Sequence, residues 1–286
     1  METAAYNRKP QNQSQNLMVF VLSMALFGLA DLVTEMIPDV EIGPIEIGIP
    51  YFGFVGLILV ALFNPLYAAL GAAVGEVIFG DLLMGDFGGI GELEGVLTLF
   101  IGLYIAGLLV NNSKNRLNIA IAGMIGIGIE QLLGGVADVI KVSVGVSELE
   151  AVEGLPQSIV LLELVENVNE WIISGIIVGI LPAMFMLPRL HGKLEPLLGI
   201  KPRTNSSYRA AAGSLLALSA GIFIIAVLFG VLGESLELGA WEPDFIDQYG
   251  GGFVWVGIGI AALVAIAVML IAFSSRKSIP RQAEKL

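Results

Sequence analysis

The sequence predicts an all-α integral membrane protein with about eight transmembrane helices, and its composition and apolar patterning are the reasons. Hydrophobic residues make up 56% of the 286 residues, whereas only 14% are charged, and the mean hydropathy is +0.86. A soluble domain usually has about 25% charged residues, so this chain lacks the polar surface that water requires. The apolar residues also form runs long enough for helices that cross a bilayer.

Eight apolar runs are candidate spans, of which the second and fourth are shorter than the roughly 20 residues that a bilayer core requires. They cover approximately residues 16–37, 51–63, 66–84, 95–110, 117–140, 158–187, 210–232 and 251–273. The second run is short and ends at Asn64-Pro65, where a proline favours a tight turn between antiparallel helices. A re-entrant segment is the alternative for this run. Many of the 36 glycines lie inside the spans, where small residues allow helices to approach closely.

The distribution of charge predicts that both termini are cytoplasmic. With the N-terminus inside, 13 of the 14 Lys and Arg residues fall in cytoplasmic segments, and only Lys141 falls outside. This agrees with the excess of basic residues that cytoplasmic loops carry. The outer loops 38–50, 85–94, 141–157 and 233–250 are acidic. We therefore expect a multi-pass protein of the cell (cytoplasmic) membrane.

The spans divide into two predicted units. Residues 1–187 contain the first six spans and are expected to form one membrane core. Residues 188–209 form a basic cytoplasmic loop that contains Pro188, Pro196 and Pro202. Residues 210–286 are then a two-helix membrane hairpin with a cytoplasmic tail.

Carboxylates inside the spans are the most informative feature for function. A charge near the bilayer centre is costly, so such groups usually face a cavity or a partner. On the predicted topology nine acids lie between the midplane and the outer surface. They are Asp31, Glu35, Glu76, Asp81, Glu130, Asp138, Glu163, Glu166 and Glu170.

The spacing of these acids predicts which of them act together. Glu163, Glu166 and Glu170 follow i, i+3, i+7 spacing and share one helix face, which Asn167 extends. Glu76 and Asp81 are five residues apart. On a regular α-helix they point about 140° away from each other, so we do not expect them to serve one site.

We expect Glu130, Glu166 and Glu170 to line one outward-facing cavity, with Glu76 as a further member and Asn167 and Glu163 beside them. No Lys or Arg lies in the predicted spans to neutralise these acids. They must be protonated, bind a cation or border water. The cavity would then attract a positively charged solute or a metal ion, and binding would weaken as the pH falls. Acids near span ends can instead be hydrated at the interface, which is the alternative for Asp31, Glu35, Asp81, Asp138 and Glu163.

Several functional classes are excluded or disfavoured by composition. The net charge of −12 leaves no basic surface for nucleic acid. The chain has no cysteine and one histidine, His191, and it lacks the P-loop pattern of ATPases. Without a second histidine there is no base for a membrane serine protease. We therefore expect neither an enzyme nor a cofactor.

The segment 51–86, YFGFVGLILVALFNPLYAALGAAVGEVIFGDLLMGD, resembles a run in the substrate-binding S components of energy-coupling factor (ECF) transporters. In that family a short apolar helix, a turn with Asn-Pro or Gly-Pro, and a Gly/Ala-rich helix end in an acidic residue. The resemblance implies a six-helix core that captures a vitamin or metal ion, with segment 38–50 as a lid. It also implies a transmembrane T component and two cytoplasmic ATPases as partners. The family's Ala-x-x-x-Ala spacing on the first helix is absent here.

Three functions remain open at this point. The first is a membrane transport protein of the S-component type that captures a small, cationic solute from outside. The second is a self-standing cation channel or secondary transporter that uses the buried acids. The third is a membrane assembly or structural protein whose acidic outer face meets another protein. Copurification with an ATPase pair would separate the first from the others.

Overall fold

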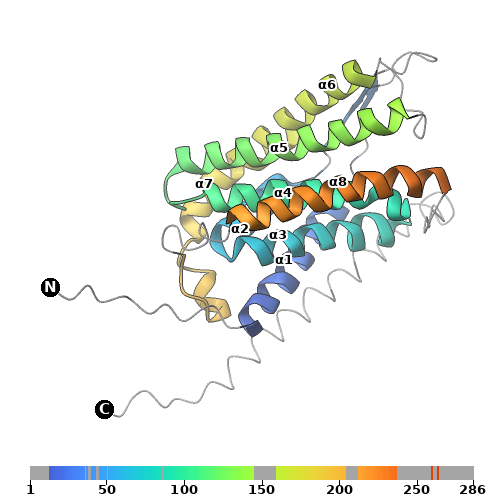
Figure 1. Ribbon diagram of the computed structural model, residues 1–286. Coiled ribbons are helices and arrows are strands. Elements are labelled where there is room, and N and C mark those ends of the chain that lie inside the picture. The colour runs from blue at the N-terminus through green and yellow to red at the C-terminus, as the bar shows by residue number, and fades with distance from the viewer. Residues whose placement is uncertain are drawn as a thin grey trace, which may run out of the picture.

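The computed structural model describes residues 13–35, 37, 40–42, 45–49, 51–85, 87–144, 159–203, 212–236, 259 and 263. Figure 1 shows an elongated bundle whose helices run approximately along one another. Its α-helices are α1 (Gln13–Thr34), α2 (Gly53–Leu62), α3 (Pro65–Glu76), α4 (Leu93–Leu109), α5 (Arg116–Ser143), α6 (Ile159–Glu170), α7 (Leu181–Leu190) and α8 (Ala212–Leu236). Two π-helical segments, η1 (Val77–Leu82) and η4 (Trp171–Ile180), continue α3 and join α6 to α7. Two short 3-10 helices, η2 (Gly89–Glu92) and η5 (Glu195–Leu198), also lie in the described part of the chain.

The described helices identify a membrane protein. Five are long and apolar enough to cross a bilayer: Gln13–Thr34, Pro65–Leu82, Arg116–Ser143, Ile159–Leu190 and Gly213–Gly233. Two shorter apolar helices, Gly53–Leu62 and Leu93–Leu109, coincide with the second and fourth predicted spans. Seven of the predicted spans are therefore helical, and five of them reach spanning length. The eighth, 251–273, lies outside the described residues apart from Gly259 and Leu263.

The short helix α2 lies inside the bundle. Its 10 residues extend about 15 Å at 1.5 Å per residue, which is half the thickness of a hydrocarbon core. All of its residues from Gly56 to Leu62 are buried. It contacts α1, α3, α4, η4 and α7. Helix α2 is apolar because protein surrounds it, so its hydropathy reflects core packing as much as lipid contact.

The turn between α2 and α3 has the predicted form. Pro65 occupies the first turn of α3, where its missing N–H removes no helical hydrogen bond. The side chain of Asn64 caps the helix by accepting a hydrogen bond of 3.2 Å from the backbone N–H of Leu66.

Close backbone contact joins α1 to α3. A Cβ atom added to Gly71 would collide with the carbonyl oxygen of Phe20, and one added to Gly75 would collide with that of Met24. Gly28 on α1 faces Gly75 in the same way. These glycines therefore set the distance between the two helices, as small residues do in membrane bundles.

Helix α8 packs on α4 and η2 and has fewer contacts with α5. Its Phe223, Ala226 and Val227 are buried, whereas Leu218, Ile224 and Leu228 are at least 60% exposed. Such an apolar outer face suits contact with lipid. The predicted hairpin partner of α8 lies outside the described residues.

The chain is not entirely helical. Strands β1 (Val40–Ile42) and β2 (Ile45–Ile47) form a two-stranded antiparallel sheet in the predicted outer loop 38–50. Strand β2 contacts α6. This short hairpin is a local addition to a helical structure, and it brings the connection between α1 and α2 to the α5–α6 end of the bundle (Figure 1).

The predicted basic loop 188–209 is folded against the bundle as far as Arg203. The side chain of Glu195 is fully buried, accepts a hydrogen bond of 2.8 Å from the backbone N–H of Gly192, and lies 3.2 Å from His191. Arg203 donates to the carbonyl oxygen of Val60, in the last turn of α2, at 3.1 Å. This contact satisfies one of the carbonyls that a helix C-terminus leaves unpaired.

Candidate cation-binding cavity

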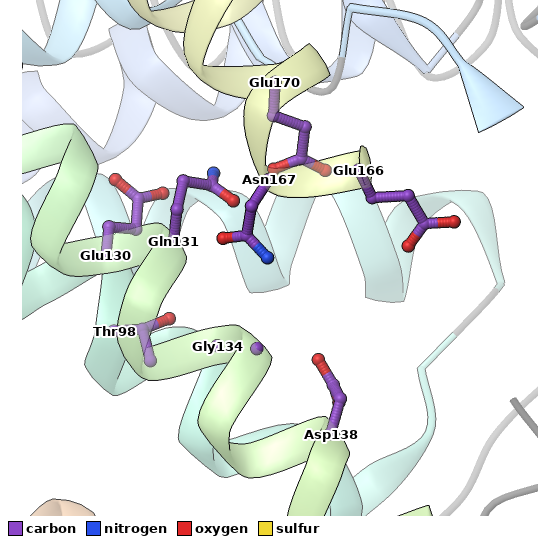
Figure 2. Close-up of a pocket in the computed structure, with 9 residues that line it drawn as sticks. Thr98, Glu130, Gln131, Gly134, Asp138, Glu166, Asn167 and Glu170 are labelled. Atoms are coloured by element: carbon purple, nitrogen blue, oxygen red, sulfur yellow. The ribbon is translucent and has the colours of Figure 1, made fainter. Parts of the chain in front are cut away.

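A polar cavity lies between α5 and α6, with α4 behind it (Figure 2). Its volume is about 220 Å³. Every residue of its lining is polar or glycine: Thr98, Glu130, Gln131, Gly134, Gly135, Asp138, Glu166, Asn167 and Glu170. Polar linings are unusual within an apolar bundle, because polar groups buried without partners are costly.

Helix α5 contributes the first wall of the cavity. Gln131, Gly134 and Asp138 are spaced i, i+3, i+7, so they follow one helix face, and Glu130 borders the same face. A Cβ atom added to Gly134 would meet no atom within 4 Å, apart from the helix's own backbone. The glycine therefore leaves room that a larger side chain would occupy.

Helix α6 contributes the opposite wall. Glu166, Asn167 and Glu170 lie on one face, and Figure 2 shows their side chains on the cavity side of the helix. Gln131 and Glu170 form a side-chain hydrogen bond, in which the amide donates to the carboxylate. This bond connects the two walls at one end of the cavity.

Glu130 is held by a residue from a third part of the chain. The hydroxyl of Tyr51, just before α2, donates a hydrogen bond of 2.9 Å to Oε2 of Glu130. Tyr51 is 6% exposed and Glu130 is 7% exposed. On the α4 side, a Cβ atom on Gly102 would lie 2.7 Å from Cβ of Glu130. Glu130 is therefore fixed from two sides while its carboxylate borders the cavity.

The structure brings together four of the six predicted site residues. Glu130, Glu166, Asn167 and Glu170 line the cavity. Glu76 is not among the lining residues and belongs to a different group of acids, described next. The backbone of Glu163 lies in α6, but its side chain is outside the described part of the structure.

Glu76, at the end of α3, lies within electrostatic range of Asp31 on α1, Glu35 directly after α1, Asp81 on η1 and Glu130 on α5. The carboxylate of Asp31 lies against η1, because a Cβ atom on Gly80 would be 2.5 Å from its Oδ2. Asp81 therefore acts on Glu76, although the regular α-helical angle predicted that the two residues point apart. The π-helical segment that begins at Val77 has i→i+5 hydrogen bonding, so the regular α-helical angle between the two residues does not apply.

The sequence did not single out Tyr51, Thr98 and Gln131 as site residues, and for Asp138 it left hydration at the interface as the alternative. The stripe formed by Gln131, Gly134 and Asp138 was a signal in the sequence, since it matches the polar stripe on the next span. Tyr51 carried no such signal, because its partner is 79 residues away.

The titratable residues around the cavity are acidic, and none of the described residues that line it is basic. The buried Lys141, predicted to lie in an outer loop, is in the last turn of α5 and forms an ion pair with Glu94 of α4. In the described part of the chain, no group of three or more His, Cys, Asp or Glu residues is placed to hold a metal ion.

The fold and this cavity define a helical membrane protein with an acidic polar chamber between two of its spans. The chain belongs to a family of unknown function, DUF8171, which it matches over residues 18–281. No curated protein matches it, and no solved structure does.

Proposed function

We propose that this protein is a membrane transport protein that captures a small organic cation in the cavity between α5 and α6. The supporting observation is the presence of four carboxyl groups, those of Glu130, Asp138, Glu166 and Glu170, around a chamber to which the described residues contribute no basic side chain. Carboxyl groups buried in membrane spans commonly mark the pathway of a substrate or an ion. The predicted topology places the cavity mouth on the outer side of the cell membrane.

The chemistry of the lining favours an organic ammonium compound over a bare metal ion. Metal binding requires several oxygen ligands at about 2.0–2.6 Å in a defined geometry, and the described residues form no such group. An ammonium group needs only hydrogen-bond acceptors at ordinary distances, which carboxylates and the oxygens of Asn167 and Thr98 provide. Acids on both α5 and α6 suit a ligand with two amino groups.

The experiment is a binding titration of the purified protein with 1,4-diaminobutane, followed by the variants Glu130→Gln and Glu170→Gln. Each exchange preserves size and hydrogen bonding but removes one charge, so we expect affinity to fall by tenfold or more in each variant. Leu132→Ala is the control, because Leu132 lies on α5, is 69% exposed and does not line the cavity. Wild-type affinity in both Gln variants would refute the proposal.

One observation favours a self-standing transporter over an S component. Ser23, Ala25 and Gly28 of α1 are buried in the bundle, and Gly28 packs on Gly75 of α3. The outer face of α1 carries Leu17, Leu26 and Val33 instead. The small residues of α1 therefore do not form a free docking face for a T component. Purification of the tagged chain from its native membrane tests this: an S component would retain a T component and two ATPases.

A further inference from the structure

The acids that surround Glu76 form a second buried group, separate from the cavity lining. Glu76 ends α3, Asp31 comes from α1 and Asp81 from η1. One carboxylate oxygen of Glu76, Oε2, is fully buried and has no hydrogen-bond partner among the described residues. A buried acceptor of this kind is costly unless it holds a proton or a ligand.

The charges that act on Glu76 from the described part of the chain are all acidic: Asp31 from α1, Glu35 directly after it, Asp81 from η1 and Glu130 from α5. Like charges that share a buried site cannot all be ionised. Since the described residues place no metal site here, the proton is the cation that suits this group.

Tyr51 is within electrostatic range of Glu76 and of two residues that line the cavity. Its hydroxyl donates to Glu130 at 2.9 Å, and Glu76 and Glu170 both act on it electrostatically. The negative charge of Glu76 therefore reaches the cavity through a buried, low-dielectric path. A cation beside Glu130 is therefore bound more strongly when Glu76 is ionised than when Glu76 is protonated.

We propose that Glu76, together with Asp31 and Asp81, is a proton-binding site coupled to the cation cavity, so that capture of a cation releases a proton. This inference rests on the proposed function. The exchange is balanced: a carboxylic acid loses its proton to water, and the resulting carboxylate charge is offset by the incoming cation. Because coupling between sites is reciprocal, protonation of Glu76 lowers cation affinity by the same factor by which the cation lowers proton affinity. Such couplings typically change affinity by about 5- to 150-fold.

The test measures protons released when purified full-length protein binds 1,4-diaminobutane near neutral pH. Titration calorimetry in buffers with different ionisation enthalpies gives this number directly. We expect net proton release from the wild-type protein, with cation affinity that rises with pH. Glu76→Gln should still bind the cation, should release less than half as many protons and should show a flatter dependence of affinity on pH.

Two further variants keep the result interpretable. Leu132→Ala is the control, because Leu132 lies on α5, is 69% exposed and belongs neither to the cavity lining nor to the acids around Glu76. It should leave proton release unchanged. If Glu76→Gln fails to fold, Asp31→Asn alters the same site from α1 and should reduce release.

The outcomes separate the two proposals. Cation binding with equal proton release in wild type, Glu76→Gln and Asp31→Asn overturns the proton site and leaves the cation cavity standing. Binding by wild type without any proton release overturns it as well. The absence of diaminobutane binding to the wild-type protein overturns both proposals.

Discussion

Lys141, in the last turn of α5, forms a buried ion pair with Glu94, in the first turn of α4. Their side chains are 7% and 6% exposed. The pair joins two helices that also approach closely near Gly102 and Gly126. It lies beyond the cavity in the direction of the α5 C-terminus, so it fixes the wall of the cavity without lining it.

Lys141→Met should destabilise the protein strongly, because it leaves the charge of Glu94 buried without its partner. The expected loss in the free energy of unfolding is about 3–5 kcal/mol, measured by detergent-induced unfolding. The double variant Lys141→Met/Glu94→Leu should recover much of this loss, since it removes both charges. A single variant as stable as wild type would show that the ion pair does not hold α4 to α5.

Gly134→Leu should block the cavity without removing any charge. The position is open to the cavity, so a leucine side chain occupies space that a cation requires. We expect affinity for 1,4-diaminobutane to fall by at least tenfold, measured by calorimetry. Gly221→Leu is the control, because Gly221 on α8 also has no atom within 4 Å of an added Cβ and does not line the cavity. Unchanged affinity in Gly134→Leu would place the bound cation elsewhere.

Tyr51→Phe should destabilise the protein by about 1–3 kcal/mol, because it removes the donor from a buried carboxyl group and leaves that acceptor unsatisfied. The measurement is a double-mutant cycle with Glu130→Met, which removes the acceptor of this hydrogen bond. If the hydrogen bond is the cause, the two changes are not additive, and the coupling should be about 0.5–3 kcal/mol. Additive effects of the two substitutions would contradict this role for Tyr51.

Hydropathy predicted most of the fold because apolar runs are the strongest signal that a membrane helix produces. It located seven helices and the turn at Asn64-Pro65. It could not distinguish α2, which is apolar because other helices enclose it, from a helix that faces lipid. The hairpin of β1 and β2 was missed because two strands of three residues are too short to show a clear alternation.

The candidate site was predictable where its residues share a helix. Glu166, Asn167 and Glu170 followed from spacing on α6 alone. Spacing could not place Glu76 relative to Glu130, because that depends on how α3 packs against the other helices. The π-helical segments η1 and η4 begin directly after Glu76 and Glu170. Any angle calculated past these residues from an α-helical repeat is therefore wrong, as the placement of Asp81 shows.

Gly75→Ala should destabilise the bundle, because its new methyl group would collide with the backbone carbonyl of Met24 on α1. The backbone cannot rotate away as a flexible side chain could, so α1 and α3 must separate. The expected loss is about 1–3 kcal/mol in the free energy of unfolding, measured by detergent-induced unfolding. Gly213→Ala on α8, where an added Cβ meets no atom within 4 Å, is the matched control and should remain at or above wild-type stability. Equal stability of the two variants would show that α1 and α3 do not depend on this close contact.

Separation of α1 from α3 would also move Asp31 away from Gly80. Gly75→Ala should therefore reduce the proton release that accompanies cation binding, whereas Gly213→Ala should not.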